Sequence, residues 1–136
     1  MISDLLAFLN ARLDEIERLA NQAQPWPYGS DPATAWIGIP GPNPLYVWAH
    51  MTAHDPAHVL REVAAKRALI AFALENAARV DGEWGDCHEA AEIARGQCGD
   101  YGEDAAYEVL GPLAAIDGDH VDYRQEWAPE GSSDAR

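Results

Sequence analysis

Apolar residues near the N-terminus repeat with the period of an α-helix. At about 100° per residue, the apolar side chains of this segment fall on one arc of a helical wheel. These are Leu5, Leu6, Phe8, Leu9, Leu13, Ile16, Leu19 and Ala20. Ser3 is a suitable N-cap, and Asp4 follows it at the positive end of the helix dipole. The pattern predicts an amphipathic helix over residues 3–22 with one buried face.

A longer helix is predicted to begin at Asp55-Pro56, because aspartate is a strong N-cap and proline suits the first helical position. The apolar pattern continues to about Arg79, and Asp81-Gly82 is expected to end the helix. One face carries Val59, Leu60, Val63, Ile70, Leu74 and Ala78. Arg67 lies in the middle of this face, so we expect it to pair with a carboxylate such as Asp119, Asp122 or Glu126.

The opposite face of this helix is also apolar, through Ala65, Ala68, Leu69 and Phe72. A helix with two apolar faces either lies centrally in a bundle or buries its second face against another chain. We expect the central position. The alternative is a homodimer formed through the Leu69/Phe72 face.

Between the two helices, two short runs rich in aromatic and β-branched residues, 34–39 and 45–48, flank a Pro-Gly-Pro-Asn-Pro turn. This pattern predicts a β-hairpin at about 34–48, lying on the helices. The flanking prolines restrict its strands to short or edge strands.

The last third of the chain predicts shorter elements. They are a short helix at about 87–95, a helix from Glu103 or Asp104 that Gly111-Pro112 kinks or divides, a turn at 117–120, and a short helix at 120–127 that anchors Tyr123 and Trp127. The fold class predicted from the whole pattern is mostly α (α+β), a small helical domain with a β-hairpin inserted between the first two helices. The 136 residues suit one domain, which we expect over 1–127, followed by a frayed tail at 128–136.

The net charge of −14, with Lys66 the single lysine, repels phosphates and disfavours direct nucleic-acid binding. No apolar stretch reaches the roughly 20 residues that span a membrane. The N-terminus lacks the basic start of a secretory signal, so we expect a cytoplasmic protein without a membrane partner. The charge has three explanations: solubility, a docking surface for a basic partner, or imitation of the DNA backbone.

Three of the five histidines, His50, His54 and His58, fall within nine residues. His50 and His54, together with Cys98 and His120, have the ligand types of a tetrahedral zinc site, in which Cys87 is the alternative thiolate. The spacing matches neither Cys-x-x-Cys nor His-Glu-x-x-His. The structural alternative is that His54 caps or staples the second helix, while His50 packs beside Trp48.

Three segments resemble one family. They are Asp4-Leu-Leu-Ala-Phe-Leu-x-Ala-Arg-Leu-Asp-Glu15, His50-x-x-x-His-Asp-Pro-Ala-x-Val-Leu-Arg-Glu-Val-x-Ala-Lys-Arg67 and Asp119-His-x-Asp-Tyr-Arg-Gln-Glu-Trp127. Their order and residues resemble an uncharacterised family of short acidic proteins from actinobacteria and their phages, a domain of unknown function. The resemblance implies a cytoplasmic protein of such an organism and supplies no activity. Tyr107 stands near where relatives often carry a cysteine, which weakens the inference of a metal site.

The leading hypothesis is a non-enzymatic cytoplasmic accessory or interaction protein, host- or phage-encoded, that acts on a protein partner through its acidic surface. One alternative is a zinc-binding module or metal-dependent enzyme that uses the His50–His58 junction with Cys98 and His120. A second is an acidic DNA mimic that inhibits a basic partner. The sequence assigns no catalytic residue and no cofactor other than the zinc of the first alternative.

Overall fold

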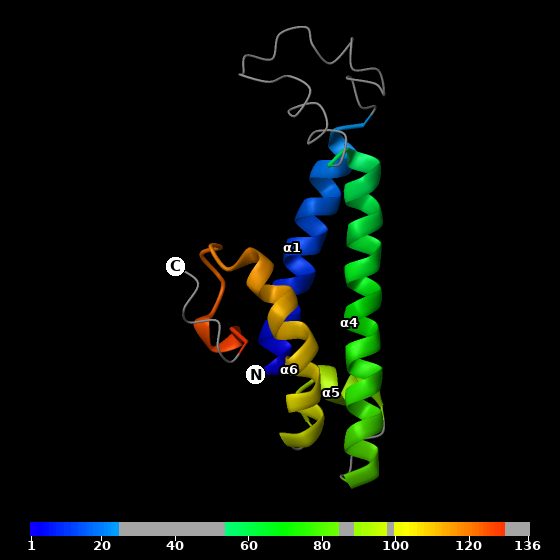
Figure 1. Cartoon of the computed structure of the whole chain (residues 1–136), viewed down its shortest axis with the longest axis vertical. Helices are drawn as coiled ribbons and strands as arrows, with labels where there is room; N and C mark the ends of the chain where they lie inside the picture. The colour runs from blue at the N-terminus through cyan, green and yellow to red at the C-terminus, as the bar shows by residue number, and fades with distance from the viewer. Residues whose placement is uncertain (25–53, 85–88, 98–99, 130–136) are drawn as a thin grey trace, which may run out of the picture. The chain divides into compact units, whose positions relative to one another are not determined.

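The computed structural model describes residues 1–24, 54–84, 89–97 and 100–129, most of which lie in helices (Figure 1). Its elements are α1 (Ile2–Gln22), α4 (Pro56–Trp84), α5 (Ala90–Ala94), α6 (Asp100–Ala114) and the 3₁₀ helices η1 (Ala115–Asp117) and η2 (Gln125–Trp127).

The predicted α+β class is wrong, because the described residues contain helices and no strand. The strands expected at 34–39 and 45–48 lie outside the described residues, and no hairpin is part of the described all-α fold. The prediction rested on β-propensity, which mainly reflects how a residue packs against neighbouring strands. Two short runs between prolines were therefore weak evidence for a sheet.

The chain divides into two compact units. The first contains Met1–Leu13 and Ala65–Arg136, and the second contains Asp14–Ala64. Helices α1 and α4 each contribute to both units. The predictions of one domain over 1–127 and of a frayed tail stay predictions; of that tail, the structure describes Ala128 and Pro129.

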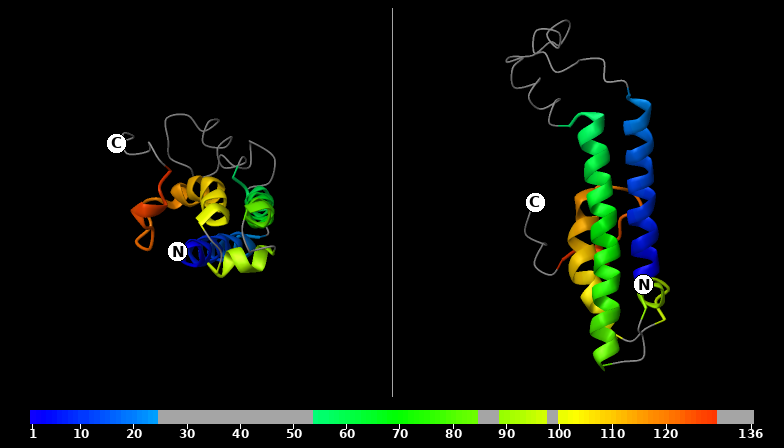
Figure 2. Two further views of the ribbon diagram at one scale, coloured as in Figure 1. Left: turned by 90° about the horizontal axis from the view of Figure 1, so that it is seen from below. Right: turned by 90° about the vertical axis from the view of Figure 1, so that its right-hand side faces the viewer.

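The first unit has a core of small and aliphatic side chains. Helix α1 buries most of its predicted arc there, and the views in Figure 2 show α5 and α6 beside the start of this helix. The buried side chains of the unit include Ile2, Leu5, Leu9, Ile70, Ala77, Ile93, Ala106, Leu110 and Trp127. The apolar pattern therefore identified the buried side of α1 as far as Leu13, but Leu19, predicted on the same arc, is 50% exposed. Of the face predicted for α4, Val63, Ile70 and Ala78 are buried.

Helix α1 begins one residue before the predicted N-cap. Ser3 lies inside the helix, so it cannot serve as the cap. The backbone N–H of Ile2 instead donates to the Glu103 carboxylate of α6 at 2.8 Å. A side chain about a hundred residues away in sequence thus satisfies one of the free N–H groups of the first turn, which local sequence cannot reveal.

Helix α4 begins as predicted, with Asp55 as its cap. The His58 N–H donates to Asp55 Oδ1 at 2.7 Å, and Pro56 is the first helical residue. The helix does not end at Asp81-Gly82 but continues to Trp84. Asp81 is buried, and a Cβ placed on Gly102 of α6 would lie 2.9 Å from Asp81 Cβ. This close contact supports the final turn against the local Asp-Gly stop signal.

Helix α6 starts at Asp100 and runs through Gly111-Pro112 to Ala114, so the proline does not divide it. The helix predicted at 87–95 is the shorter α5, which begins after its N-cap Glu89, whose backbone N–H donates to the Glu92 carboxylate at 3.2 Å. The helix predicted at 120–127 is wrong in extent, because η2 is a single 3₁₀ turn. Trp127 is nevertheless 3% exposed, so its role as an anchor is confirmed.

Candidate functional site

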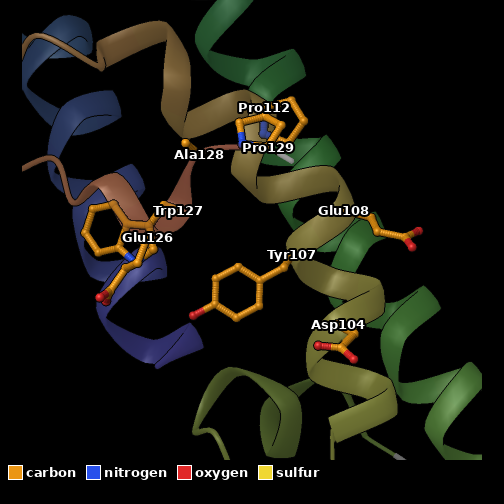
Figure 3. A pocket seen from close by; sticks show the side chains of 8 residues that line it. All are labelled: Asp104, Tyr107, Glu108, Pro112, Glu126, Trp127, Ala128 and Pro129. Carbon is orange, nitrogen blue, oxygen red and sulfur yellow. The ribbon is translucent and has the colours of Figure 1, made fainter. Parts of the chain in front are cut away.

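A pocket of about 610 Å³ lies in the first unit, between α6 and the C-terminal segment (Figure 3). Its volume is within the range of small-molecule sites. Its lining is acidic and aromatic: Asp104, Tyr107, Glu108, Pro112, Glu126, Trp127, Ala128 and Pro129. These residues include three carboxylates and no basic side chain.

One wall of the pocket is a single face of α6. Asp104, Tyr107, Glu108 and Pro112 are three, one and four residues apart, which places them on neighbouring turns of one side of the helix. The carboxylates of Asp104 and Glu108 are exposed along this edge. Glu126 is exposed on the opposite edge, so carboxylates lie on both sides of the opening (Figure 3).

The other wall approaches α6 closely because residue 111 has no side chain. A Cβ placed on Gly111 would lie 2.8 Å from the carbonyl oxygen of Trp127, nearer than real Cβ contacts allow. Any other residue at this position would force the C-terminal segment away from α6. Gly111 therefore sets the width of the pocket.

Aromatic contacts hold Trp127 in this wall. Its ring centroid lies 5.2 Å from that of Phe8 and 5.9 Å from that of Tyr123. The Arg124 guanidinium lies 5.4 Å from the ring centroid, and it donates a hydrogen bond to Asp4 at 3.0 Å. Two residues near the start of α1 thus hold this wall in place: Phe8 through an aromatic contact and Asp4 through a charged hydrogen bond.

Tyr107 extends from α6 with its hydroxyl toward the side of the pocket that carries Glu126 and Trp127 (Figure 3). Burial raises the pKa of this phenol above its ordinary value of 10.0, and the carboxylates of Glu103, Glu126 and Asp4 raise it further. Arg124 opposes the shift. The phenol is therefore neutral at physiological pH; burial is the main cause of the upward shift of its pKa, and the nearby carboxylates add to it.

Two groups in the pocket walls lack a hydrogen bond that such groups usually make: one is a side-chain N–H and the other is a backbone carbonyl. The Trp127 indole N–H is buried and has no hydrogen-bond partner among the described residues. Pro112 has no N–H, so it cannot donate the usual helical hydrogen bond to the Glu108 carbonyl. The unpaired donor of the pocket walls is therefore the Trp127 indole N–H.

His120, a predicted zinc ligand, lies in a polar cluster with Arg12. The Arg12 guanidinium lies 3.1 Å from His120 Nε2 and 3.8 Å from the Asp117 carboxylate. Because arginine is always a donor, Nε2 acts as the acceptor. The Asp122 backbone N–H lies 3.2 Å from Nδ1. A neutral imidazole accepts at only one of its two nitrogens, so the contact with Arg12 places the ring proton on Nδ1. A zinc ion on Nε2 would have to displace the Arg12 guanidinium.

The other predicted ligands lie elsewhere or outside the described chain. His54 is exposed at the start of α4, where its ring centroid lies 6.3 Å from that of His58, and His58 Nε2 is 3.5 Å from Glu62. His50, Cys87 and Cys98 lie outside the described residues. The described ranges contain no group of three or more His, Cys, Asp or Glu that could hold a metal ion. The zinc site of His50, His54, Cys98 and His120 stays a prediction.

Sequence reasoning missed two of the important side chains. Arg12 lies on the same helical arc as Leu5 and Leu9, so the argument applied to Arg67 would have identified it as a buried cation. Arg67 itself is half-buried, and its expected pairing stays a prediction. The sequence indicates Tyr107 only as an apolar position of the helix from Glu103 or Asp104 and as standing near where relatives often carry a cysteine. Its signal was its position beside two carboxylates on the helical face that leads to Pro112.

The second apolar face of α4 is open in the described structure. Leu69 is 48% exposed and Phe72 is 60% exposed, so the expected central position of α4 is wrong. The alternative homodimer contact through these residues stays a prediction. None of the described helices combines the length and apolar character needed to cross a membrane.

Comparison with other proteins gives a family but no activity. No curated protein matches the chain, and no solved structure matches it. A family of unknown function, DUF6221, matches residues 2–129, a range that holds every helix described above. The chain therefore belongs to the DUF6221 family, which confirms its resemblance to an uncharacterised family.

Proposed function

We propose that this protein is a non-enzymatic accessory protein of the cytoplasm that binds a basic segment of a protein partner. The binding surface is the pocket between α6 and the C-terminal segment, together with its acidic edges. The observation that carries the proposal is the lining, which contains three carboxylates and two aromatic side chains and no basic residue. Arg124 lies beside this lining, with its guanidinium 3.7 Å from Glu126 Oε1, so Asp104 and Glu108 supply most of the charge open to a partner. Such a surface suits a partner that brings both positive charge and apolar contact.

The electrostatics of the whole chain favour the same partner. A net charge of −14 attracts basic surfaces over a distance and raises the rate of encounter. Within the pocket, burial is the main cause that raises the pKa of Tyr107, and the carboxylates of Glu103, Glu126 and Asp4 raise it further, so the charges near the phenol also favour a positive group. The net charge of the chain and the charges of the pocket lining are therefore both negative, and both attract a basic partner.

An exposed aromatic residue enlarges the surface beyond the pocket. Tyr101 is 69% exposed and lies seven residues before Glu108, hence on the same side of α6. Tyrosine combines a large contact area with a hydroxyl group, and it is enriched at protein interfaces. A peptide lying along α6 would contact Tyr101 and the pocket at the same time.

Affinity purification from an actinobacterial lysate, the host that the resemblance implies, tests the proposal. The test variant removes the three pocket charges: Asp104→Asn, Glu108→Gln and Glu126→Gln. The control removes three other exposed charges: Glu75→Gln, Glu83→Gln and Asp119→Asn. Both variants change the net charge equally, so they separate a local surface from the general effect of charge.

We expect the unmodified protein and the control to recover the same basic protein by mass spectrometry, and the pocket variant to lose it. Release of that protein by added DNA would identify the acidic surface as a DNA mimic. Recovery of acidic or neutral partners alone, or equal recovery by both variants, would refute the proposal.

A further inference from the structure

We infer that the pocket binds one arginine side chain of the partner, with the guanidinium between the carboxylate edges and a main-chain carbonyl of the same peptide directed to the Trp127 indole. This inference rests on the proposed function and specifies its ligand. It is drawn from the shape of the pocket, its acceptors and its one unpaired donor.

The aromatic side chains suit a flat cation. A guanidinium is planar, weakly hydrated and able to stack on an aromatic ring. The molecule already contains one such pair, since Arg124 lies 5.4 Å from the centroid of the Trp127 ring. Tyr107 reaches into the pocket from the other wall and presents a second ring (Figure 3).

The acceptors of the pocket are spread over two edges. Asp104 and Glu108 lie along α6, and Glu126 lies on the opposite side (Figure 3). Glu126 Oε1 is 3.7 Å from the Arg124 guanidinium, so the carboxylate of Glu126 would be shared between Arg124 and the ligand. The Glu108 carbonyl, which Pro112 leaves without its usual helical donor, adds a neutral acceptor to the α6 wall. Arginine has five N–H donors in a fixed plane and can address several acceptors at once. The compact lysine ammonium has three donors and a stronger hydration shell, so it matches this arrangement less well.

The Trp127 indole points to a peptide rather than to a free cation. Its N–H is buried in the pocket wall without a partner, on the ring edge nearer to the Glu126 carboxylate and the Tyr107 hydroxyl in Figure 3. An unpaired buried donor is costly, so a ligand that supplies an acceptor gains from pairing it. A peptide carries carbonyl oxygens next to its arginine, whereas a metal ion or a polyamine carries none.

The test is an NMR titration of the ¹⁵N-labelled full chain with the capped tripeptide acetyl-Gly-Arg-Gly-amide. The Trp127 indole resonance is identified by its loss in Trp127→Phe. We expect it to shift on binding, with a dissociation constant on the order of 1 mM, as suits a single side chain. The lysine tripeptide should bind at least threefold more weakly, and the tripeptide with uncharged citrulline should not bind measurably. Free arginine should bind more weakly than the arginine tripeptide, because the capped peptide supplies neutral carbonyls.

Variants locate the site. Tyr107→Leu and Glu126→Gln should each weaken the arginine tripeptide at least fivefold, whereas Tyr107→Phe keeps the ring and should stay within twofold. Glu75→Gln on α4 is the matched charge control and should not change the affinity. Pro112→Ala restores the N–H for the Glu108 carbonyl, so it should weaken binding while raising the melting temperature, which a loss of folding would not do.

Equal binding of the arginine and lysine tripeptides, or an indole resonance that does not move, would overturn the inference. Polylysine in the same titration distinguishes the two proposals. If polylysine binds, the pocket variant abolishes that binding, and the arginine tripeptide binds no more tightly than the lysine tripeptide, the preference for arginine fails while the proposed function stands. If neither polylysine nor the arginine tripeptide binds, both proposals fail.

Discussion

Arg12 shows how a single charged residue can serve as part of a helix's inner face. Its side chain is 18% exposed on the arc that otherwise carries leucines, and it reaches Asp117 and His120 in the turn after η1. The aliphatic part of arginine covers apolar surface while the guanidinium pairs with these partners. The residue therefore ties α1 to a segment more than a hundred residues further along the chain.

Replacing Arg12 with alanine should lower the free energy of unfolding by about 1–3 kcal/mol, because it leaves half-buried Asp117 and His120 without their donor. Urea denaturation of the variant measures the loss. Arg18→Ala is the control, since Arg18 bonds to Gln22 on an exposed surface and should cost less than about 0.5 kcal/mol. Equal losses for the two variants would mean that the Arg12 cluster contributes nothing specific.

Tyr107 makes the stability of the protein depend on pH at the alkaline end. Its pKa is raised in the folded state from 10.0, so the unfolded chain loses this proton first. The contribution is therefore complete below pH 10.0 and is lost as the pH rises through the folded pKa. We expect the Tyr107 phenol carbon, followed by NMR, to titrate above pH 10.0, and Glu126→Gln to lower its midpoint. A midpoint at or below 10.0 would contradict the effect of burial and of the nearby carboxylates on this phenol.

At the scale of elements, α6 contains two adjacent residues, Gly111 and Pro112, that are unusual inside a helix. Gly111 permits the contact with the Trp127 carbonyl, and Pro112 removes a hydrogen bond from the helix. Most helices would avoid both residues, because each lowers helix propensity. Here they build the pocket, one through its missing side chain and the other through its missing N–H.

Gly111→Ala should destabilise the protein by about 1–3 kcal/mol, because the new Cβ overlaps the Trp127 carbonyl. The near-ultraviolet circular dichroism of the tryptophans should change with it, since the C-terminal wall must move. Pro112→Ala at the next position should instead stabilise the helix by about 1 kcal/mol or more. Thermal unfolding of the two variants measures both changes in stability. A stabilising Gly111→Ala would show that the C-terminal segment can yield without cost.

At the scale of the whole molecule, the apolar periodicity predicted features that neighbouring residues determine. It failed for features that depend on contacts between residues far apart in the sequence. It found the inner arc of α1 and the Asp55-Pro56 start of α4, both set by neighbouring residues. It placed the end of α4 too early, because Gly102 and Asp81 meet through the tertiary fold. The pocket was unpredictable for the same reason: its two walls are joined by Gly111 and Trp127, and no local pattern relates them.

The net charge of −14 should make the folded protein sensitive to ionic strength. Compact acidic chains repel themselves, and salt screens that repulsion over a Debye length of about 10 Å at 0.1 M. The melting temperature should therefore rise from about 0.02 to about 0.2 M sodium chloride. Differential scanning fluorimetry can follow it, with sucrose as an uncharged additive for comparison. A fall in melting temperature would mean that attractive pairs such as Arg124–Asp4 outweigh the repulsion.

The hydrogen bond between Arg124 and Asp4 joins residues 120 positions apart, and Trp127 packs on Phe8 beside it. Closing so long a loop is slow compared with forming a helix. On the ribosome, α1 would leave the exit tunnel long before Arg124 and Trp127 are synthesised. The pocket would thus form only after the chain has grown past Pro129, and a premature stop codon ahead of Glu126 would leave the nascent helices without it.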